Sequence, residues 1–196
     1  MYTSRTGLVL GFHGTDQSIV TSVLNGERDL KASENSYDWL GNGIYFWDNS
    51  PSRALEWAEG LSKRPKSKIK KPAVIGAIID LGYCLDLLDY QNLSLLKEGY
   101  SILQTTFSTS KSNFPLNRGN SEDLLHRELD CAVIETLHQS IENSTEKSFD
   151  SVRGVFWEGK NIYETAGFRE KNHIQICIRN VNCIKGYFLP LPRIMK

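Results

Sequence analysis

The chain of 196 residues lacks any apolar run close to the roughly 20 residues that are needed to span a bilayer. Its first uninterrupted apolar stretch, Gly7 to Phe12, is six residues long, which is too short for the core of a signal peptide. We therefore expect a protein that does not enter a membrane and that acts in the cytoplasm.

An excess of charge of one sign is also missing, because 23 basic side chains balance 23 acidic ones. This balance argues against a protein that binds nucleic acid through bulk charge alone, although a local basic patch remains open. Such a patch is present in the segment 63–71, where six of nine residues are Lys or Arg. A run of this kind is usually a solvated linker, but it can also hold phosphates.

Cysteine is scarce and has no metal-binding or redox spacing. Cys84, Cys131, Cys177 and Cys183 stand in apolar surroundings, and no C-x-x-C pair occurs. We interpret them as buried thiols in a reducing compartment, and we expect neither a disulfide framework nor a metal site.

The remaining composition is that of a folded protein, with 40% apolar and 23% charged residues, and the length suits one domain spanning 1–196. Apolar periodicity and capping residues predict strands and helices in alternation, with strands clustered at both ends of the chain, hence an α+β fold. The expected strands are 7–13, 43–47, 73–81, 152–157, 173–179 and 183–189, and the expected helices are 16–24, 51–61, two pieces within 84–107, and 121–141.

Three segments carry residues suited to chemistry. In the first, an apolar strand ends in His13, followed by Gly14 and Thr15. A histidine at the end of a strand can reach over a cleft, and a glycine lets a ligand approach the backbone. The alternative is a turn that happens to contain a histidine.

The second segment is the strand 43–47, which follows the glycine pair Gly41 and Gly43. Strand alternation places Gly43, Tyr45 and Trp47 on one face, a surface that can stack a flat heteroaromatic ring. Trp57, on the next helix, would cover the other side of that ring. The alternative is that these aromatic residues form ordinary core.

The third segment is the strand 173–179. One of its faces carries isoleucines, and the other carries His173, Gln175, Cys177 and Arg179. A polar row of this kind normally faces solvent. Because another strand follows closely, we expect an inner strand with a cleft on its polar side.

Taken in this order, the three segments resemble the ADP-ribosyltransferase superfamily, in its H-Y-E branch of poly(ADP-ribose) polymerases and diphtheria-like toxins. His13-Gly14-Thr15 matches the first motif, and Gly41 to Phe46 followed by Ala54 and Trp57 matches the second. The resemblance implies split antiparallel β-sheets that clamp NAD+ in a cleft. It covers the strands at both ends of the chain, and we interpret the middle, about 84–145, which carries little of it, as a helical insertion.

The resemblance also implies roles for single residues. His13 would bond the ribose hydroxyls of NAD+, the Gly14 backbone would hold the nicotinamide carboxamide, and Tyr45 would stack on the nicotinamide ring opposite Trp57. Thr15 and Gly43 would complete the NAD+ contacts. No metal is implied, and His13, Tyr45 and Gln175 would form the catalytic set.

The chain departs from the family at the third position, where a glutamate is usual and Gln175 stands. Glutamine can bond a ribose hydroxyl but cannot act as a general base. This substitution favours a single transfer over polymer formation, and it leaves open an inactive NAD-binding module. Asn172, or the loop glutamates Glu164 and Glu170, are the alternative third residues.

The loop 158–170 lies where the superfamily recognises its acceptor. Within this loop, an acceptor could be contacted by Tyr163, Glu164, Phe168, Arg169 and Glu170. The alternative is a solvated loop whose aromatic side chains fold under it.

The resemblance therefore implies a mono-ADP-ribosyltransferase that modifies an intracellular macromolecule, either a nucleic acid such as RNA or a protein. Small proteins of this kind are commonly toxins of toxin–antitoxin or anti-phage systems, which implies an antitoxin partner. An RNA 2′-phosphotransferase remains as a further alternative. The arginine-type branch is rejected because no Glu-x-Glu occurs.

Overall fold

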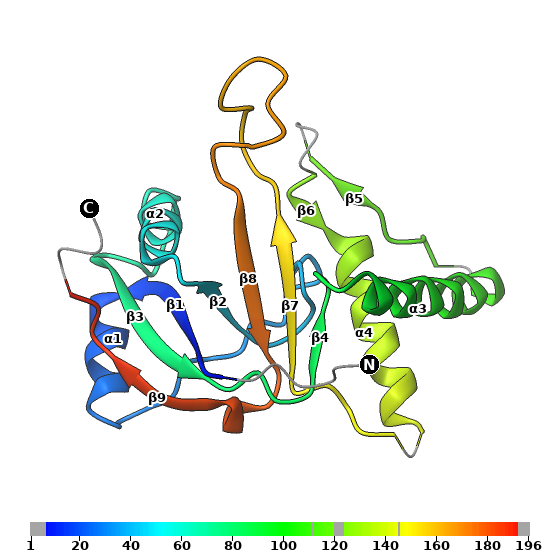
Figure 1. Ribbon diagram of the computed structural model, residues 1–196, viewed down its shortest axis with the longest axis horizontal. Coiled ribbons are helices and arrows are strands. Elements are labelled where there is room, and N and C mark those ends of the chain that lie inside the picture. The colour runs from blue at the N-terminus through cyan, green and yellow to red at the C-terminus, as the bar shows by residue number, and fades with distance from the viewer. Residues whose placement is uncertain (1–6, 111, 120–123, 145, 192–196) are drawn as a thin grey trace.

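The computed structural model describes residues 7–110, 112–119, 124–144 and 146–191, and its described elements form an α+β architecture (Figure 1). In chain order these elements are β1 (Val9–Asp16), α1 (Gln17–Leu24), β2 (Ile44–Asp48), α2 (Pro51–Ser62), β3 (Pro72–Ile79), β4 (Cys84–Asp86), α3 (Tyr90–Thr109), β5 (Asn117–Arg118), β6 (His126–Arg127), α4 (Glu128–Glu142), β7 (Ser151–Phe156), β8 (His173–Ile178), the 3-10 turn η1 (Val181–Cys183) and β9 (Ile184–Phe188).

Seven strands form one sheet in the order β4-β7-β8-β2-β1-β3-β9, and β5 and β6 form a separate hairpin. Every pairing in the large sheet is antiparallel except that of β4 with β7. The two halves of the sheet meet at β1 and β2 through only two residue pairs, Gly11 with Asp48 and Phe12 with Trp47. By contrast, β1 pairs with β3 along its whole length.

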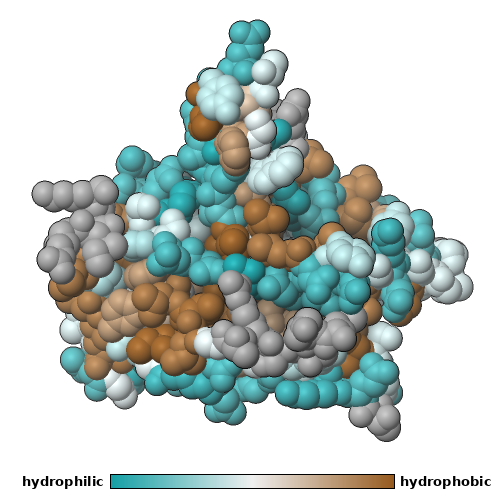
Figure 2. Space-filling model, in the orientation of Figure 1, coloured by the Kyte–Doolittle hydropathy of each residue, from teal (hydrophilic) through white to brown (hydrophobic). Residues whose placement is uncertain are grey.

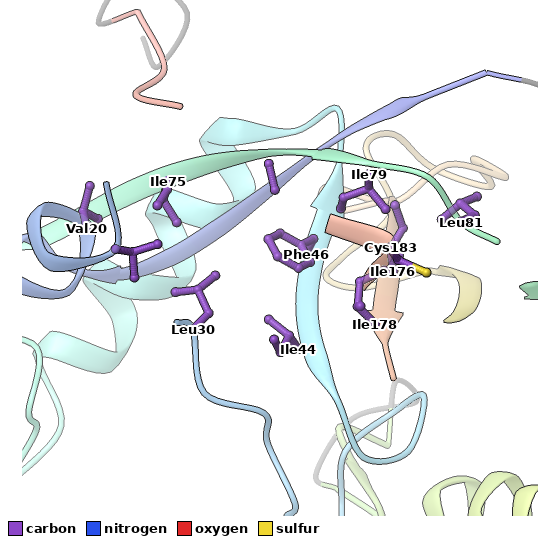
Figure 3. Packing of buried hydrophobic residues seen from close by; sticks show 12 residues of the cluster. Val20, Leu30, Ile44, Phe46, Ile75, Ile79, Leu81, Ile176, Ile178 and Cys183 are labelled. Atoms are coloured by element: carbon purple, nitrogen blue, oxygen red, sulfur yellow. The ribbon is translucent and has the colours of Figure 1, made fainter. Parts of the chain in front are cut away.

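One face of the sheet packs under α1. The isoleucines of β2, β3 and β8 surround the fully buried Phe46 in a single cluster, to which α1 contributes Val20 and Val23 (Figure 3). The alternation expected for β2 and β8 is therefore confirmed, because Ile44, Phe46, Ile176 and Ile178 all lie in this cluster.

The opposite face is covered at its two ends by different helices. At the β4–β7 end, α4, which packs against α3, buries Ile134 and Leu137 on Val152 and Leu85. At the β1–β3 end, α2 buries Ala54 in a cluster with Phe12, Trp47 and Val74. The central strands β2 and β8 lie between these two covers, and this arrangement determines the place of the candidate site.

The middle of the chain differs from the sequence prediction. Two helical pieces were expected within 84–107, but Cys84–Asp86 is the edge strand β4 and only α3 is helical. The segment 84–145 is therefore not a purely helical insertion, because β4 extends the main sheet by pairing with β7.

The helix expected from 121 starts at Glu128, and the proposed cap at 121–123 lies outside the described residues. The amide oxygen of Asn117 accepts hydrogen bonds from the backbone N–H groups of Leu129 and Asp130. A residue from the β5–β6 hairpin thus satisfies the first turn of α4, and a local sequence pattern does not reveal such a contact.

Three general expectations can be compared with the described part of the chain. Its helices include none that is both long and apolar enough to cross a membrane. All four cysteines are free thiols, and Cys131, Cys177 and Cys183 are buried, whereas Cys84 is half-buried. Among the described residues, no group of three or more His, Cys, Asp or Glu side chains is placed to hold a metal ion.

Candidate functional site

His13 lies where β1 and β2 separate. Beyond Phe12 the two strands no longer pair. The Tyr45 carbonyl therefore accepts a hydrogen bond from Nδ1 of His13, at 2.7 Å, and not from a backbone N–H of β1. A carbonyl oxygen can only accept a hydrogen bond, so Nδ1 carries the proton and the neutral ring presents Nε2 as an acceptor. Burial lowers the pKa of His13, although the bond to the carbonyl opposes this effect, and the ring is therefore neutral at pH 7.

Tyr45 is held by the loop that precedes its own strand. Its hydroxyl donates to the Gly41 carbonyl at 2.7 Å and accepts from the Leu40 N–H at 2.8 Å. Burial is the main cause that raises the pKa of Tyr45 far above its usual value, so the hydroxyl stays protonated. The ring is therefore fixed in orientation before any ligand binds.

This loop is clamped from two further sides. The Glu135 carboxylate of α4 accepts the Asn42 N–H at 2.8 Å and pairs with Arg179 at 2.5 Å. The Cys177 thiol donates to the carbonyls of Gly41 and Asn42 at 3.6 and 3.5 Å. A side chain at Gly43 would collide with the Cys177 Sγ at 2.5 Å and the Ile178 carbonyl at 2.6 Å, so only glycine fits there.

A cleft of about 750 Å³ opens on the uncovered central strands, a size within the usual range of small-molecule sites. Of the residues predicted from the sequence, His13, Gly43, Tyr45, Trp57 and Gln175 line it. Trp47 lines it as well and packs against Trp57, with the ring centroids 5.5 Å apart. Three separate segments of the chain are thus brought to one cleft.

Gly14 and Thr15 do not line this cleft. A Cβ at Gly14 would run into the Ala54 carbonyl, so glycine is required there by the close approach of α2 to β1. Thr15 is half-buried and pairs with Ala73 of β3.

Gln175 is half-buried at the centre of β8, opposite Trp47 on β2 and Gly154 on β7. Cross-strand partners project to the same face, so Gln175 lies on the side of Tyr45 and Trp47, away from the isoleucine cluster. Of the alternatives for the third position, Asn172, Glu164 and Glu170 are not among the residues that line the cleft.

Sequence reasoning missed a network of ion pairs on the cleft wall. Arg53 of α2 pairs with Glu158 at 2.7 Å, and Lys171 pairs with Glu56 of α2 at 2.6 Å. The four residues line the cleft and join α2 to the end of the β7–β8 hairpin. Glu158 is the first residue of the loop 158–170, which was expected to contact the acceptor, but nothing in its position along the chain indicates a partner on α2.

The expected acceptor loop extends the β7–β8 hairpin and stands above the rest of the molecule (Figures 1 and 2). Tyr163 and Phe168 are 59% and 62% exposed, so they do not fold under the loop. The Glu170 carboxylate accepts the Lys160 N–H at 3.2 Å, and the Arg169 N–H donates to the Asn172 side chain at 3.2 Å. Tyr163, Glu164, Phe168, Arg169 and Glu170 all lie outside the cleft lining.

Beside Gln175, the cleft is bounded by an aromatic stack. Trp39 packs on Phe156, with centroids 4.4 Å apart, and on the buried His173, at 6.2 Å. The Arg127 guanidinium lies 4.8 Å from the Trp39 ring centre. Burial lowers the pKa of His173, and its Nδ1 donates to the Lys171 carbonyl at 2.7 Å. His173 thus supports the wall of the cleft.

No family model matches the chain. A comparison with characterised and uncharacterised proteins finds similarity to the uncharacterized protein MJ0359 of Methanocaldococcus jannaschii. The two are 26% identical over 193 residues, which covers 89% of this chain and 83% of that protein.

Proposed function

We propose that the chain is a mono-ADP-ribosyltransferase, built on an ADP-ribosyltransferase fold, that transfers ADP-ribose from NAD+ to an intracellular macromolecule. The observation that carries the proposal is the convergence of His13, Tyr45, Trp57 and Gln175 on one cleft. The short β1–β2 junction supports the fold assignment, because the family resemblance implies a split sheet and these two strands pair at only two positions.

The geometry suits each role in the transfer. The fixed Tyr45 ring and the Trp57 indole offer aromatic surfaces for the nicotinamide ring. Nε2 of the neutral His13 accepts a hydrogen bond from a ribose hydroxyl, and a neutral imidazole adds no charge beside the cationic nicotinamide of NAD+. The Gln175 amide can bond the 2′-hydroxyl.

In the reaction, the bond between the nicotinamide nitrogen and ribose C1′ breaks, and nicotinamide leaves with the electron pair. A nucleophilic atom of the acceptor then bonds to C1′ and releases its proton to solvent. Gln175 cannot take that proton as a carboxylate would, which supports a single transfer and not polymer growth.

The test is incubation of the chain with NAD+ that is radiolabelled in its adenylate phosphate, together with cell extract, followed by nuclease or protease digestion. We expect label on macromolecules, and we expect Tyr45→Ala to abolish it. Tyr90→Ala is the matched control, because Tyr90 is 77% exposed on α3 and lies outside the cleft lining. Binding of NAD+ without transfer would indicate the inactive module, and NAD+ consumption only with 2′-phosphorylated RNA would indicate the phosphotransferase.

We propose further that the chain acts in the cytoplasm as a toxin with an antitoxin partner. Expression of the chain alone should then stop bacterial growth. His13→Ala should remove this toxicity while the circular dichroism spectrum stays unchanged. Equal toxicity of a folded His13→Ala variant would contradict the role of His13.

A further inference from the structure

The cleft extends past the residues assigned to NAD+. Its lining also contains a second set of side chains, which we call the outer cleft: Lys31, Tyr37, Trp39, Lys63 and Arg64. None of these has a part in the roles assigned to His13, Tyr45, Trp57 and Gln175. The set combines two aromatic rings with three cations, and each half can be examined for what it would bind.

The two aromatic rings of the outer cleft are held in fixed orientations. Tyr37 stacks on His126, with centroids 4.7 Å apart, and remains 42% exposed. The Trp39 indole N–H donates to the Leu125 carbonyl at 2.9 Å, and the Arg127 guanidinium lies over its ring. Fixed, partly exposed rings beside a cleft can stack a planar base with little loss of side-chain entropy.

The cations of the outer cleft are not neutralised by the described carboxylates. Lys31, Lys63 and Arg64 are exposed and make no ion pair with a described residue. The carboxylates of Glu56 and Glu158 are instead occupied by Arg53 and Lys171.

Two further carboxylates of the lining make no ion pair with a described residue: Glu59, and Asp38, which accepts the Asn35 N–H at 2.8 Å. The three cations of the outer cleft outnumber these two carboxylates, so the local charge is positive in a chain whose net charge is zero.

The basic segment continues from the cleft in a fixed direction. After Lys63 and Arg64, it includes Lys66, Lys68, Lys70 and Lys71. The Asp16 carboxylate accepts the backbone N–H groups of Lys70 and Lys71 at 2.7 and 2.8 Å, which ties the end of the segment to the start of α1. The positive strip thus leads out of the cleft along a path that the fold determines.

From these observations we infer that the outer cleft binds single-stranded nucleic acid. Unpaired bases stack on Tyr37 and Trp39, and the phosphates lie on Lys31, Lys63 and Arg64. Partly exposed rings beside a basic strip without ion pairs are the combination that such strands require, whereas paired bases in a duplex have no free faces to stack. The bound strand would also supply the nucleotide that accepts ADP-ribose. This second part of the inference rests on the proposed function, whereas the binding itself does not.

The binding test needs no NAD+. The affinity is measured by fluorescence anisotropy over a range of salt concentrations. The probe is an end-labelled single-stranded RNA of about 16 nucleotides, a length at the upper end of known site sizes. We expect Tyr37→Ala to weaken binding about 5- to 150-fold, the loss typical for one stacked base, and Tyr90→Ala to leave it unchanged.

The double variant Lys63→Ala/Arg64→Ala should lower the slope of log affinity against log salt by about 1.4, or about 0.7 for each phosphate contact on a single strand. Its control is Lys97→Ala/Lys185→Ala, which removes two lysines outside the cleft lining and should preserve the slope.

Three results would overturn the inference: no binding of the single strand, equal binding of the same sequence as a duplex, or an unchanged affinity of Tyr37→Ala. With radiolabelled NAD+ added, label on the RNA is expected, and label that survives nuclease but not protease would refute a nucleotide acceptor. If RNA binds as described and NAD+ does not bind, the proposed transferase function fails while the nucleic-acid site stands.

Discussion

The hydroxyl of Tyr45 allows the positioning of this residue to be tested separately from its ring. Tyr45→Phe retains the aromatic surface but removes the bonds to the Gly41 carbonyl and the Leu40 N–H. Both partner residues are buried, and Leu40 is only 1% exposed. The substitution therefore leaves a buried acceptor and a buried donor without their partner.

The size of this effect follows from the two unpaired groups. An unsatisfied buried polar group costs about 1–3 kcal/mol, and water from the neighbouring cleft can recover part of that. We expect the free energy of unfolding to fall by about 2–4 kcal/mol. With a urea m-value of about 2 kcal/mol/M, the midpoint should shift by about 1–2 M.

The assay is urea unfolding followed by circular dichroism, with Tyr90→Phe as the matched control. Tyr90 is 77% exposed, so its substitution should change stability by less than about 0.5 kcal/mol. If Tyr45→Phe proves as stable as the wild-type chain, the hydroxyl does not hold the loop and the argument for a pre-oriented ring is wrong.

Four further predictions concern the cleft and its surroundings. Trp57→Ala should weaken NAD+ binding, measured by calorimetry, by about 1–3 kcal/mol. Trp157→Ala, which removes an exposed tryptophan outside the cleft lining, should not weaken it, and an equal affinity of Trp57→Ala and the wild-type chain would contradict the stacking role. Gln175→Ala should lower turnover about tenfold to a thousandfold with a smaller effect on NAD+ affinity, and Gln175→Glu should keep or raise NAD+ hydrolysis; a parallel loss of affinity and turnover would argue against a transition-state contact. Burial lowers the pKa of His138, so the unfolded state binds more protons than the folded state below pH 6.5. The free energy of unfolding should therefore fall from pH 7.5 to pH 5.5, and it should fall less in His138→Leu. Urea midpoints at both pH values measure this difference. Glu158→Gln should weaken the tie between α2 and the β7–β8 hairpin and speed amide hydrogen exchange at the end of β7, and unchanged exchange would show that the ion pair with Arg53 contributes nothing there.

Much of the strand pattern could be predicted from the sequence because period-two alternation is a local property. Ile176 and Ile178 face the core as alternation requires, and Gln175 faces the cleft side. Asp16 caps α1, with its carboxylate accepting the Ser18 N–H at 3.0 Å, as a capping residue before an apolar periodic segment predicts. The sequence also predicts His13, Tyr45, Trp57 and Gln175 as cleft residues, and all four line the cleft, because short motifs and strand alternation are local properties too.

Features that depend on partners far along the chain could not be predicted in this way. The three residues of β4 are a strand because β7 supplies a parallel neighbour, and no pattern in so short a segment specifies that pairing. In the same way, α4 begins at Glu128 because Asn117, eleven residues earlier, caps its first turn.

The sequence by itself determined the α+β class, the faces of the strands and the types of residue that could form a site. Only the tertiary structure decided how these residues are used. It placed Gly14 under α2 and outside the cleft, paired Arg53 with Glu158, and brought Lys31, Tyr37 and Lys63 to one opening. The reason is physical: alternation and capping act between near neighbours, whereas a cleft forms where helices leave part of a sheet uncovered, and that depends on how the whole chain packs.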